Sequence, residues 1–174
     1  MKSFITFCLF LIIGSLAGGF TINFFRDKPL PMVYRGKAER LADEVALVAR
    51  DNALADSEMS MASSENPAVN LPEVLDGAAM KEIVTKGETI VLDARPALFH
   101  RLGHIPNALS LPREDFANAY AHIREKLESD KKQPLVVYCS DTSCEDSKLL
   151  RDALLKLGYT NVVIYEGGWA DWEK

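Results

Sequence analysis

The chain has 174 residues, of which 48% are hydrophobic and 26% are charged, a balance typical of a globular protein. This length suits one compact domain with an appendage. A formal net charge of -5 argues against a nucleic-acid partner, because neutralising phosphates requires clustered lysine and arginine, and the chain has no such stripe.

The first predicted element is an apolar run without charges over residues 4–25. At about 1.5 Å per residue, a helix of this length crosses a hydrocarbon core of about 30 Å, so we predict one transmembrane anchor at residues 1–25. The alternative is a secretory signal with a basic start at Lys2 and a cleavage site at residues 15–17. Three phenylalanines continue the run beyond that site, which favours an uncleaved anchor.

The charges around this run and its position in the chain disagree about the side that the domain faces. Arg26, Lys28, Arg35 and Lys37 follow the run, and the positive-inside rule would keep them in the cytoplasm. A short N-terminal apolar segment instead usually acts as an export signal. We expect export, and hence a single-pass protein of a bacterial cell membrane with its domain on the periplasmic side.

Residues 26–66 are predicted to connect the anchor to the domain. After a turn-rich collar with two prolines, residues 37–55 place Leu41, Val45 and Val48 at helical spacing with charges between them. This pattern predicts an amphipathic helix that serves as a stalk or as a cover for the domain. The small polar residues that come after it indicate a linker.

From about residue 67 to residue 174, short apolar strands alternate with helices. Asp76 and Gly77 are typical of a helix start, and Gly87 of a helix end. The remaining expected elements are strands at 89–94, 108–112, 134–138 and 162–166, helices at 113–129 and about 142–157, and turns with helical character at 95–106 and 167–172. Buried strands separated by helices predict a three-layer α/β domain with a mostly parallel sheet.

The stretch VVYCSDTSCEDS places a cysteine where a buried strand ends. Cys139 comes directly after the strand, and reactive groups of parallel α/β sheets collect at that end. A capping box at Thr142 with Glu145, or at Ser143 with Asp146, would start a helix there. The free amides of the loop would then stabilise an anionic sulfur, the nucleophilic form of a thiol. The alternative is a buried structural cysteine.

Four segments carry a family resemblance, and they are VLDARP (91–96), GHIPNALSLP (103–112), VVYCS (136–140) and GYTNVVIYEGGWADW (158–172). In this order they resemble the D-x-R segment, the G-H-I-P-G-A-x-N-x-P segment, the strand before the active cysteine and the closing G-Y-x-N-V-x-x-L-x-G-G-x-x-x-W of the rhodanese family, the single-domain sulfurtransferases. The apolar run followed by NFFRDKPLPMV also resembles membrane-tethered members. The resemblance implies a rhodanese-like fold from about residue 67.

The resemblance implies that Cys139 is the nucleophile. It would take the outer sulfur of a small donor, hold it as a persulfide and pass it to a thiol or cyanide acceptor, without a cofactor. Asp93 and Arg95 match the D-x-R pair and would support the surroundings of the active loop. The loop that would hold the sulfur through its amides consists of Ser140, Asp141, Thr142, Ser143, Cys144 and Glu145.

The chain departs from the family in this loop. The family pattern is C-x-x-G-x-R-S, whereas Cys144 and Glu145 occupy the positions of the basic residue, and Asp141 and Asp146 add negative charge. No cation occurs in the loop before Lys148. Acidic neighbours disfavour a thiolate and an anionic donor such as thiosulfate. Glu145 also replaces the arginine of C-x5-R phosphatases of this fold, which argues against phosphatase activity.

Cys144 has two interpretations, a resolving thiol that attacks a persulfide on Cys139 or a small residue that packs inward. Three functions are then open to the domain. The first is a sulfurtransferase or persulfide carrier, the second is a thiol–disulfide redox protein using both cysteines, and the third is a non-catalytic interaction module with an unknown protein partner. The three histidines are scattered along the chain and do not predict a metal site.

Overall fold

The computed structural model describes residues 35–56 and 74–174. Residues 36–174 form one compact unit. The predicted anchor at residues 1–25 and most of the predicted linker lie outside the described residues. Within the described ranges, no helix combines the length and the apolar character needed to cross a membrane.

Five parallel strands form one sheet in the order β1-β5-β4-β2-β3. The strands are β1 (Val74–Leu75), β2 (Ile90–Asp93), β3 (Leu109–Ser110), β4 (Leu135–Tyr138) and β5 (Val162–Tyr165). The structure confirms the parallel α/β prediction and its four strands. The sequence did not predict β1, because two residues are too few to show a strand pattern. In the register, Asp93 lies opposite Tyr138, so β2 and β4 end together.

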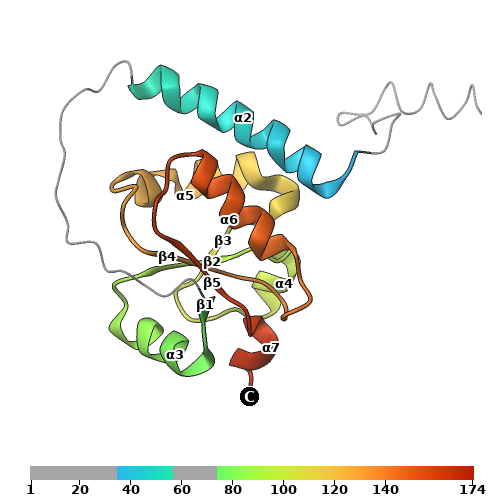
Figure 1. The fold of residues 1–174 in the computed structure, drawn as a ribbon, viewed down its shortest axis with the longest axis vertical. Coiled ribbons are helices and arrows are strands. Elements are labelled where there is room, and N and C mark those ends of the chain that lie inside the picture. Colours follow the sequence, from blue (N-terminus) through green and yellow to red (C-terminus); the bar gives the residue numbers. More distant parts are fainter. Residues whose placement is uncertain (1–34, 57–73) are drawn as a thin grey trace, which may run out of the picture. The chain divides into compact units, whose positions relative to one another are not determined.

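Helices cover both faces of the sheet (Figure 1). They are α2 (Lys37–Asp56), α3 (Gly77–Lys86), α4 (Ala97–Leu102), the 3-10 helix η1 (Arg113–Asp115), α5 (Phe116–Glu128), α6 (Asp146–Lys156) and α7 (Gly168–Trp172). The predicted ends of α3 are confirmed. The Asp76 side chain accepts a hydrogen bond of 2.8 Å from the Ala79 amide, and Gly87 ends the helix at φ 68°.

The two faces of the sheet bury two separate hydrophobic clusters. Val137 belongs to the cluster that contains residues of α5 and α6, whereas Val136 and Tyr138 belong to the cluster that contains residues of α3. This alternation is the period of two that a strand imposes. All three side chains are fully buried, so β4 runs through the core, and Cys139 follows at the point where the strand ends.

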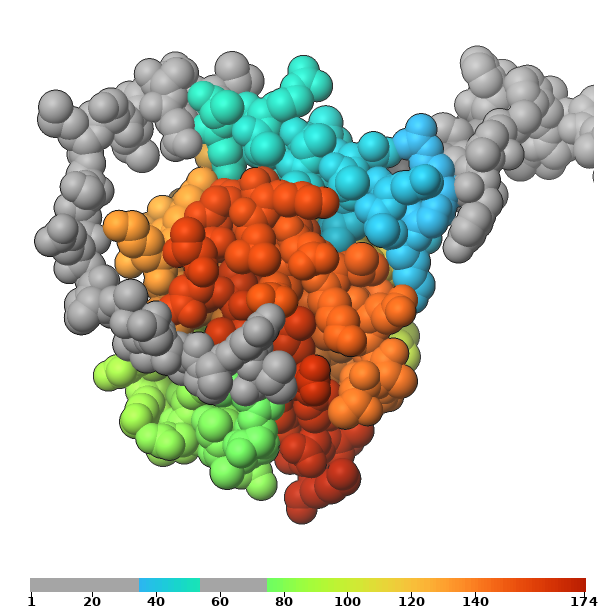
Figure 2. Space-filling model, viewed as in Figure 1, coloured from blue at the N-terminus to red at the C-terminus, as the bar shows by residue number. Residues whose placement is uncertain are grey.

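Helix α2 packs against α5 and α6 (Figure 2). The structure confirms the predicted amphipathic helix, because Leu41, Val45 and Val48 join the same hydrophobic cluster as α5 and α6. Glu44 on α2 also accepts a hydrogen bond of 2.9 Å from the amide of Ala117, in the first turn of α5. Burial raises the pKa of the Glu44 carboxyl, although this hydrogen bond acts in the opposite direction. The helix is therefore part of the packed domain.

Replacing Leu41 by alanine tests this packing. Leu41 is 4% exposed, so we expect Leu41→Ala to lower the free energy of unfolding by about 2–5 kcal/mol. Leu47 on the same helix is 54% exposed, and Leu47→Ala is expected to change it by less than about 0.5 kcal/mol. Guanidinium unfolding of the full chain, followed by tryptophan fluorescence, measures both. Equal effects of the two substitutions would show that α2 does not pack through Leu41.

Candidate active site

Cys139 is the first residue after β4, as the sequence predicts, and it is 3% exposed. The backbone around it is held by α7. The amide of Trp169 donates a hydrogen bond of 2.9 Å to the carbonyl oxygen of Cys139, and the amide of Ala170 donates one of 2.9 Å to that of Ser140. The loop at residues 139–145 therefore begins in a fixed position, because β4 leads into it and α7 is hydrogen-bonded to its first two residues.

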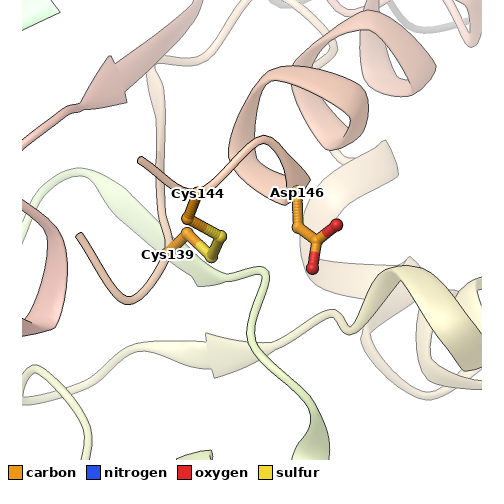
Figure 3. A group of neighbouring side chains, drawn as sticks. All are labelled: Cys139, Cys144 and Asp146. Carbon is orange, nitrogen blue, oxygen red and sulfur yellow. A yellow bond between two sulfur atoms is a disulfide. The ribbon is translucent and has the colours of Figure 1, made fainter. Parts of the chain in front are cut away.

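A disulfide joins Cys139 to Cys144 (Figure 3). Their Cα atoms lie 6.1 Å apart, within the range that disulfides require. Asp141 folds the loop between them, because its carbonyl oxygen accepts a hydrogen bond from the Cys144 amide and its side chain accepts one of 2.8 Å from the Ser143 amide. The Ser143 hydroxyl donates to the same carboxylate oxygen. These local bonds return the chain towards Cys139.

The predicted helix start at Thr142 or Ser143 is wrong. Helix α6 begins at Asp146, and the residue before it, Glu145, makes no side-chain cap. Residues 141–144 instead form a turn around Asp141, whose side chain accepts a hydrogen bond from the Ser143 amide and whose carbonyl oxygen accepts one from the Cys144 amide, and the helix begins after this turn. In this disulfide-bonded form, the amides of Ser143 and Cys144 therefore bind Asp141 and do not contribute to the predicted sulfur cradle.

Asp146 lies beside the disulfide, with a carboxylate oxygen within 4.8 Å of both Sγ atoms (Figure 3). The Nε of Arg113 donates a hydrogen bond of 2.9 Å to its Oδ1, and the Nζ of Lys37 lies 3.6 Å from the same oxygen. The negative charge that the sequence places at Asp146 is therefore paired with cations from outside the loop. No motif indicates the pairing, because Arg113 stands 33 positions earlier in the chain and meets Asp146 only through the fold.

The two cysteines and Asp146 together offer three ligand atoms of the kind that a metal ion requires. Thiolates, however, are the sulfur ligands of metals, and both sulfurs are engaged in the disulfide. The carboxylate is also paired with Arg113. The cluster in this form is thus arranged for thiol chemistry.

The D-x-R pair forms a buried network under the loop. Arg95 Nη2 donates a hydrogen bond of 2.7 Å to Asp93 and another of 2.7 Å to the Gly103 carbonyl oxygen. The Tyr138 hydroxyl donates to Asp93 at 2.7 Å and accepts from the Ile105 amide at 3.2 Å. Burial and the neighbouring Asp93 raise the pKa of Tyr138 well above its usual value, which keeps the hydroxyl protonated as a donor. Burial lowers the pKa of Arg95, but its bond to Asp93 outweighs this effect and raises it.

The guanidinium of Arg95 also stacks on an aromatic ring, which the sequence did not indicate. Its Cζ lies 4.8 Å from the centroid of the Trp169 ring, at the wall of an open cleft of about 410 Å³ beside the active loop. The residues lining this cleft are Arg95, Phe99, Leu102, Gly103, Ser140, Asp141, Trp169, Ala170 and Glu173. The D-x-R pair thus joins the loop, the cleft and the turn at Gly103.

Gly168 allows α7 to approach the loop this closely. Its φ is 61°, and a Cβ added there would lie 2.6 Å from the Cys139 carbonyl oxygen and 2.9 Å from the Asp141 nitrogen. No side chain fits at these distances, so a larger residue must displace the loop. The signal in the sequence is the GG pair before Trp169, which gives no indication of what it contacts.

Two glycine substitutions separate loop displacement from backbone strain. Gly87 has the similar φ of 68°, but a Cβ there meets nothing within 4 Å. We expect Gly87→Ala to lower the free energy of unfolding by about 1 kcal/mol and to leave the cysteines unchanged. Gly168→Ala adds the clash, and we expect it also to increase the rate at which dithiothreitol reduces the disulfide. Equal reduction rates in the two variants would contradict the role of Gly168 in holding the loop.

Residues 76–174 match the family described as the Rhodanese-like domain. A tRNA uridine(34) hydroxylase of Photorhabdus laumondii is 27% identical over 97 residues, which cover 55% of this chain and 27% of that protein. The protein of the same name from Yersinia pestis (strain Pestoides F) is 27% identical over 106 residues, which cover 60% of this chain and 29% of that protein. The chain thus spans less than a third of the length of these curated relatives.

Solved structures are similar to this chain at lower identity. An uncharacterized protein from Saccharomyces cerevisiae has a TM-score of 0.49 and 22% identity, over 58% of this chain and 90% of that chain. The human single-domain sulfurtransferase TSTD1 has a TM-score of 0.46 and 21% identity, over 59% of this chain and 96% of that chain. The family match covers more than half of the 174 residues, and the chain belongs to the rhodanese-like domain family.

Proposed function

We propose that the domain transfers sulfane sulfur through a persulfide on Cys139. One observation carries the proposal: in a rhodanese-like domain, Cys139 comes directly after β4, where the carboxyl ends of the parallel strands meet, and a second thiol lies within bonding distance. Thiols are nucleophiles as thiolates, and this edge of a parallel sheet is where reactive groups are presented.

The reaction has two steps. The Cys139 thiolate attacks the outer sulfur of a donor R–S–SH, forms Cys139–S–SH and releases the donor as the thiolate R–S⁻. An acceptor thiolate then attacks that outer sulfur, and Cys139 returns to its thiolate form. The exposed carboxylates Asp141 and Glu145 in the loop repel a doubly charged donor, so persulfides and polysulfides are favoured over thiosulfate.

Thiol–disulfide exchange is the second candidate function, and the disulfide favours it. In this cycle, the Cys144 thiolate attacks the Cys139 sulfur of the persulfide, the disulfide forms, and the sulfane sulfur leaves as hydrosulfide. An external dithiol then reduces the disulfide and restores both cysteines. The same bond also forms by direct two-electron oxidation of the two thiols, without a sulfur donor.

Cysteine variants separate these functions. After reduction, the full chain is incubated with a persulfide, a polysulfide or thiosulfate, and its mass is measured. We expect Cys144→Ser to retain one added sulfur atom, Cys139→Ser to retain none, and the wild type to release hydrosulfide and form the disulfide. Thiosulfate is expected to be the poorest donor.

Each other result has a defined meaning. Sulfur transfer by Cys139→Ser at the wild-type rate would end the sulfur-transfer proposal. Disulfide formation by the wild type under mild oxidation, with no sulfur taken up from any donor by Cys144→Ser, would favour the redox function. If both thiols of the reduced wild type stay free and unreactive, the domain is a non-catalytic interaction module.

We also propose that the apolar residues 4–25 tether the domain to a membrane, on its periplasmic side. The uncharged run is long enough to cross a hydrocarbon core, which supports the tether. The periplasmic side is supported by the resemblance of the run to an export signal, and the basic residues that follow it argue for the opposite side. We expect the full chain to resist alkaline carbonate extraction from bacterial membranes, and the domain to become sensitive to protease once the outer membrane is permeabilised. Recovery of a shortened chain in the soluble periplasmic fraction would instead identify a cleaved signal.

A further inference from the structure

We propose that Asp146 accepts the proton of the Cys144 thiol when the Cys139–Cys144 bond closes, and passes this proton to the departing hydrosulfide. The proposal rests on the proposed function, because it concerns the step in which Cys144 displaces the sulfur that Cys139 carries. The proposal gives Asp146, which is not one of the two cysteines, a direct part in the reaction as a proton acceptor and donor.

The geometry places the carboxylate where a proton must move. A carboxylate oxygen of Asp146 and both Sγ atoms lie within 4.8 Å of one another, and Figure 3 shows the carboxylate next to the two sulfurs at the start of α6. The contacts of Arg113 and Lys37 with Asp146 are both to Oδ1. In the proposed step, the Cys144 thiol of the reduced form would reach the carboxylate directly or through one water molecule.

The step balances with this single proton. Cys144–SH gives its proton to the Asp146 carboxylate and attacks the Cys139 sulfur of the persulfide as a thiolate. The bond between the Cys139 sulfur and the outer sulfur breaks, and its electron pair leaves with the outer sulfur as HS⁻. That ion takes the proton from Asp146 and departs as H₂S. The Cys144 sulfur is oxidised, the outer sulfur is reduced, the Cys139 sulfur exchanges one sulfur partner for another, and the carboxylate is regenerated.

The charged side chains that contact Asp146 are cations, so the proposed step starts and ends with the carboxylate in contact with Arg113 and Lys37. The charged or titratable groups that contact it are Arg113 from η1, Lys37 from α2 and the two cysteines of the loop. While Asp146 is ionised, it disfavours a thiolate nearby; once it takes the proton, that penalty disappears. Proton transfer and thiolate formation are therefore coupled at this position.

The burial of this ion pair also calls for a reason beyond helix capping. Asp146 is 8% exposed and Arg113 is 4% exposed. An acidic residue in the first turn of a helix is favoured without burial, whereas burying an ion pair carries a desolvation penalty. Arg113 holds the carboxylate in one orientation, and that orientation is beside the sulfurs.

The test measures sulfur loading and hydrosulfide release separately on the full chain. Loading is measured with a persulfide donor in the Cys144→Ser background, with and without Asp146→Asn, because the persulfide accumulates there. Release is measured by rapid mixing and quenching, with Cys144 present, in the wild type, Asp146→Asn and Asp146→Glu. Asp152→Asn, an exposed acid on the same helix, is the matched control. Circular dichroism checks that each variant is folded.

We expect Asp146→Asn to load sulfur at the rate of its parent and to release hydrosulfide about 100-fold more slowly at neutral pH. The difference in release rate between Asp146→Asn and the wild type should become smaller above about pH 8.5, where a thiol ionises without a base. Asp146→Glu should recover part of the rate, and Asp152→Asn should match the wild type. A purely structural role would slow release equally at every pH.

Three outcomes would overturn the proposal. Release by Asp146→Asn at the wild-type rate would show that the carboxylate takes no proton, and an equal deficit at all pH values would show that it acts only on structure. Both leave sulfur loading, and hence the proposed function, intact. Absence of loading in the Cys144→Ser parent would instead overturn the proposed function and this inference together.

Discussion

A buried carboxylate at the end of β2 is the constraint on which the cysteine-bearing edge of the sheet depends. Asp93 is fully buried, and an unpaired charge there would be strongly destabilising. Its oxygens are satisfied by Arg95 and by the Tyr138 hydroxyl, which belongs to the next strand of the sheet. Because Tyr138 directly precedes Cys139, satisfying Asp93 also fixes the place where the thiol leaves the sheet.

Helix α2 extends this arrangement beyond the family domain. The family match begins at residue 76, yet α2 contributes to the hydrophobic cluster beneath α5 and α6 and supplies Lys37 to the carboxylate beside the cysteines. Its Glu44 binds the amide of Ala117 at the first turn of α5. A segment that the sequence describes only as a stalk or a cover is therefore linked electrostatically to the loop that carries the thiols.

The sequence predicted what depends on local pattern and left out what depends on contact between distant segments. Apolar runs and capping residues predicted the parallel sheet and both ends of α3, and the position of Cys139 after a strand was evident from the residues alone. The helix start at Thr142 was wrong, because residues 141–144 form a turn around Asp141 and the helix begins only after it. The pairing of Asp146 with Arg113 had no sequence signal, since only the folded chain brings η1 to α6.

The loop's negative charge and its disulfide have one physical explanation. A stable persulfide anion needs nearby positive charge or free amides, and this loop directs two amides to Asp141 and carries no cation of its own. A second cysteine within bonding distance, beside a buried carboxylate, would instead favour a persulfide that is displaced soon after it forms. If Cys139 takes up sulfur as proposed, the residues that depart from the family pattern would act on the fate of that sulfur, because Cys144 is placed to displace it.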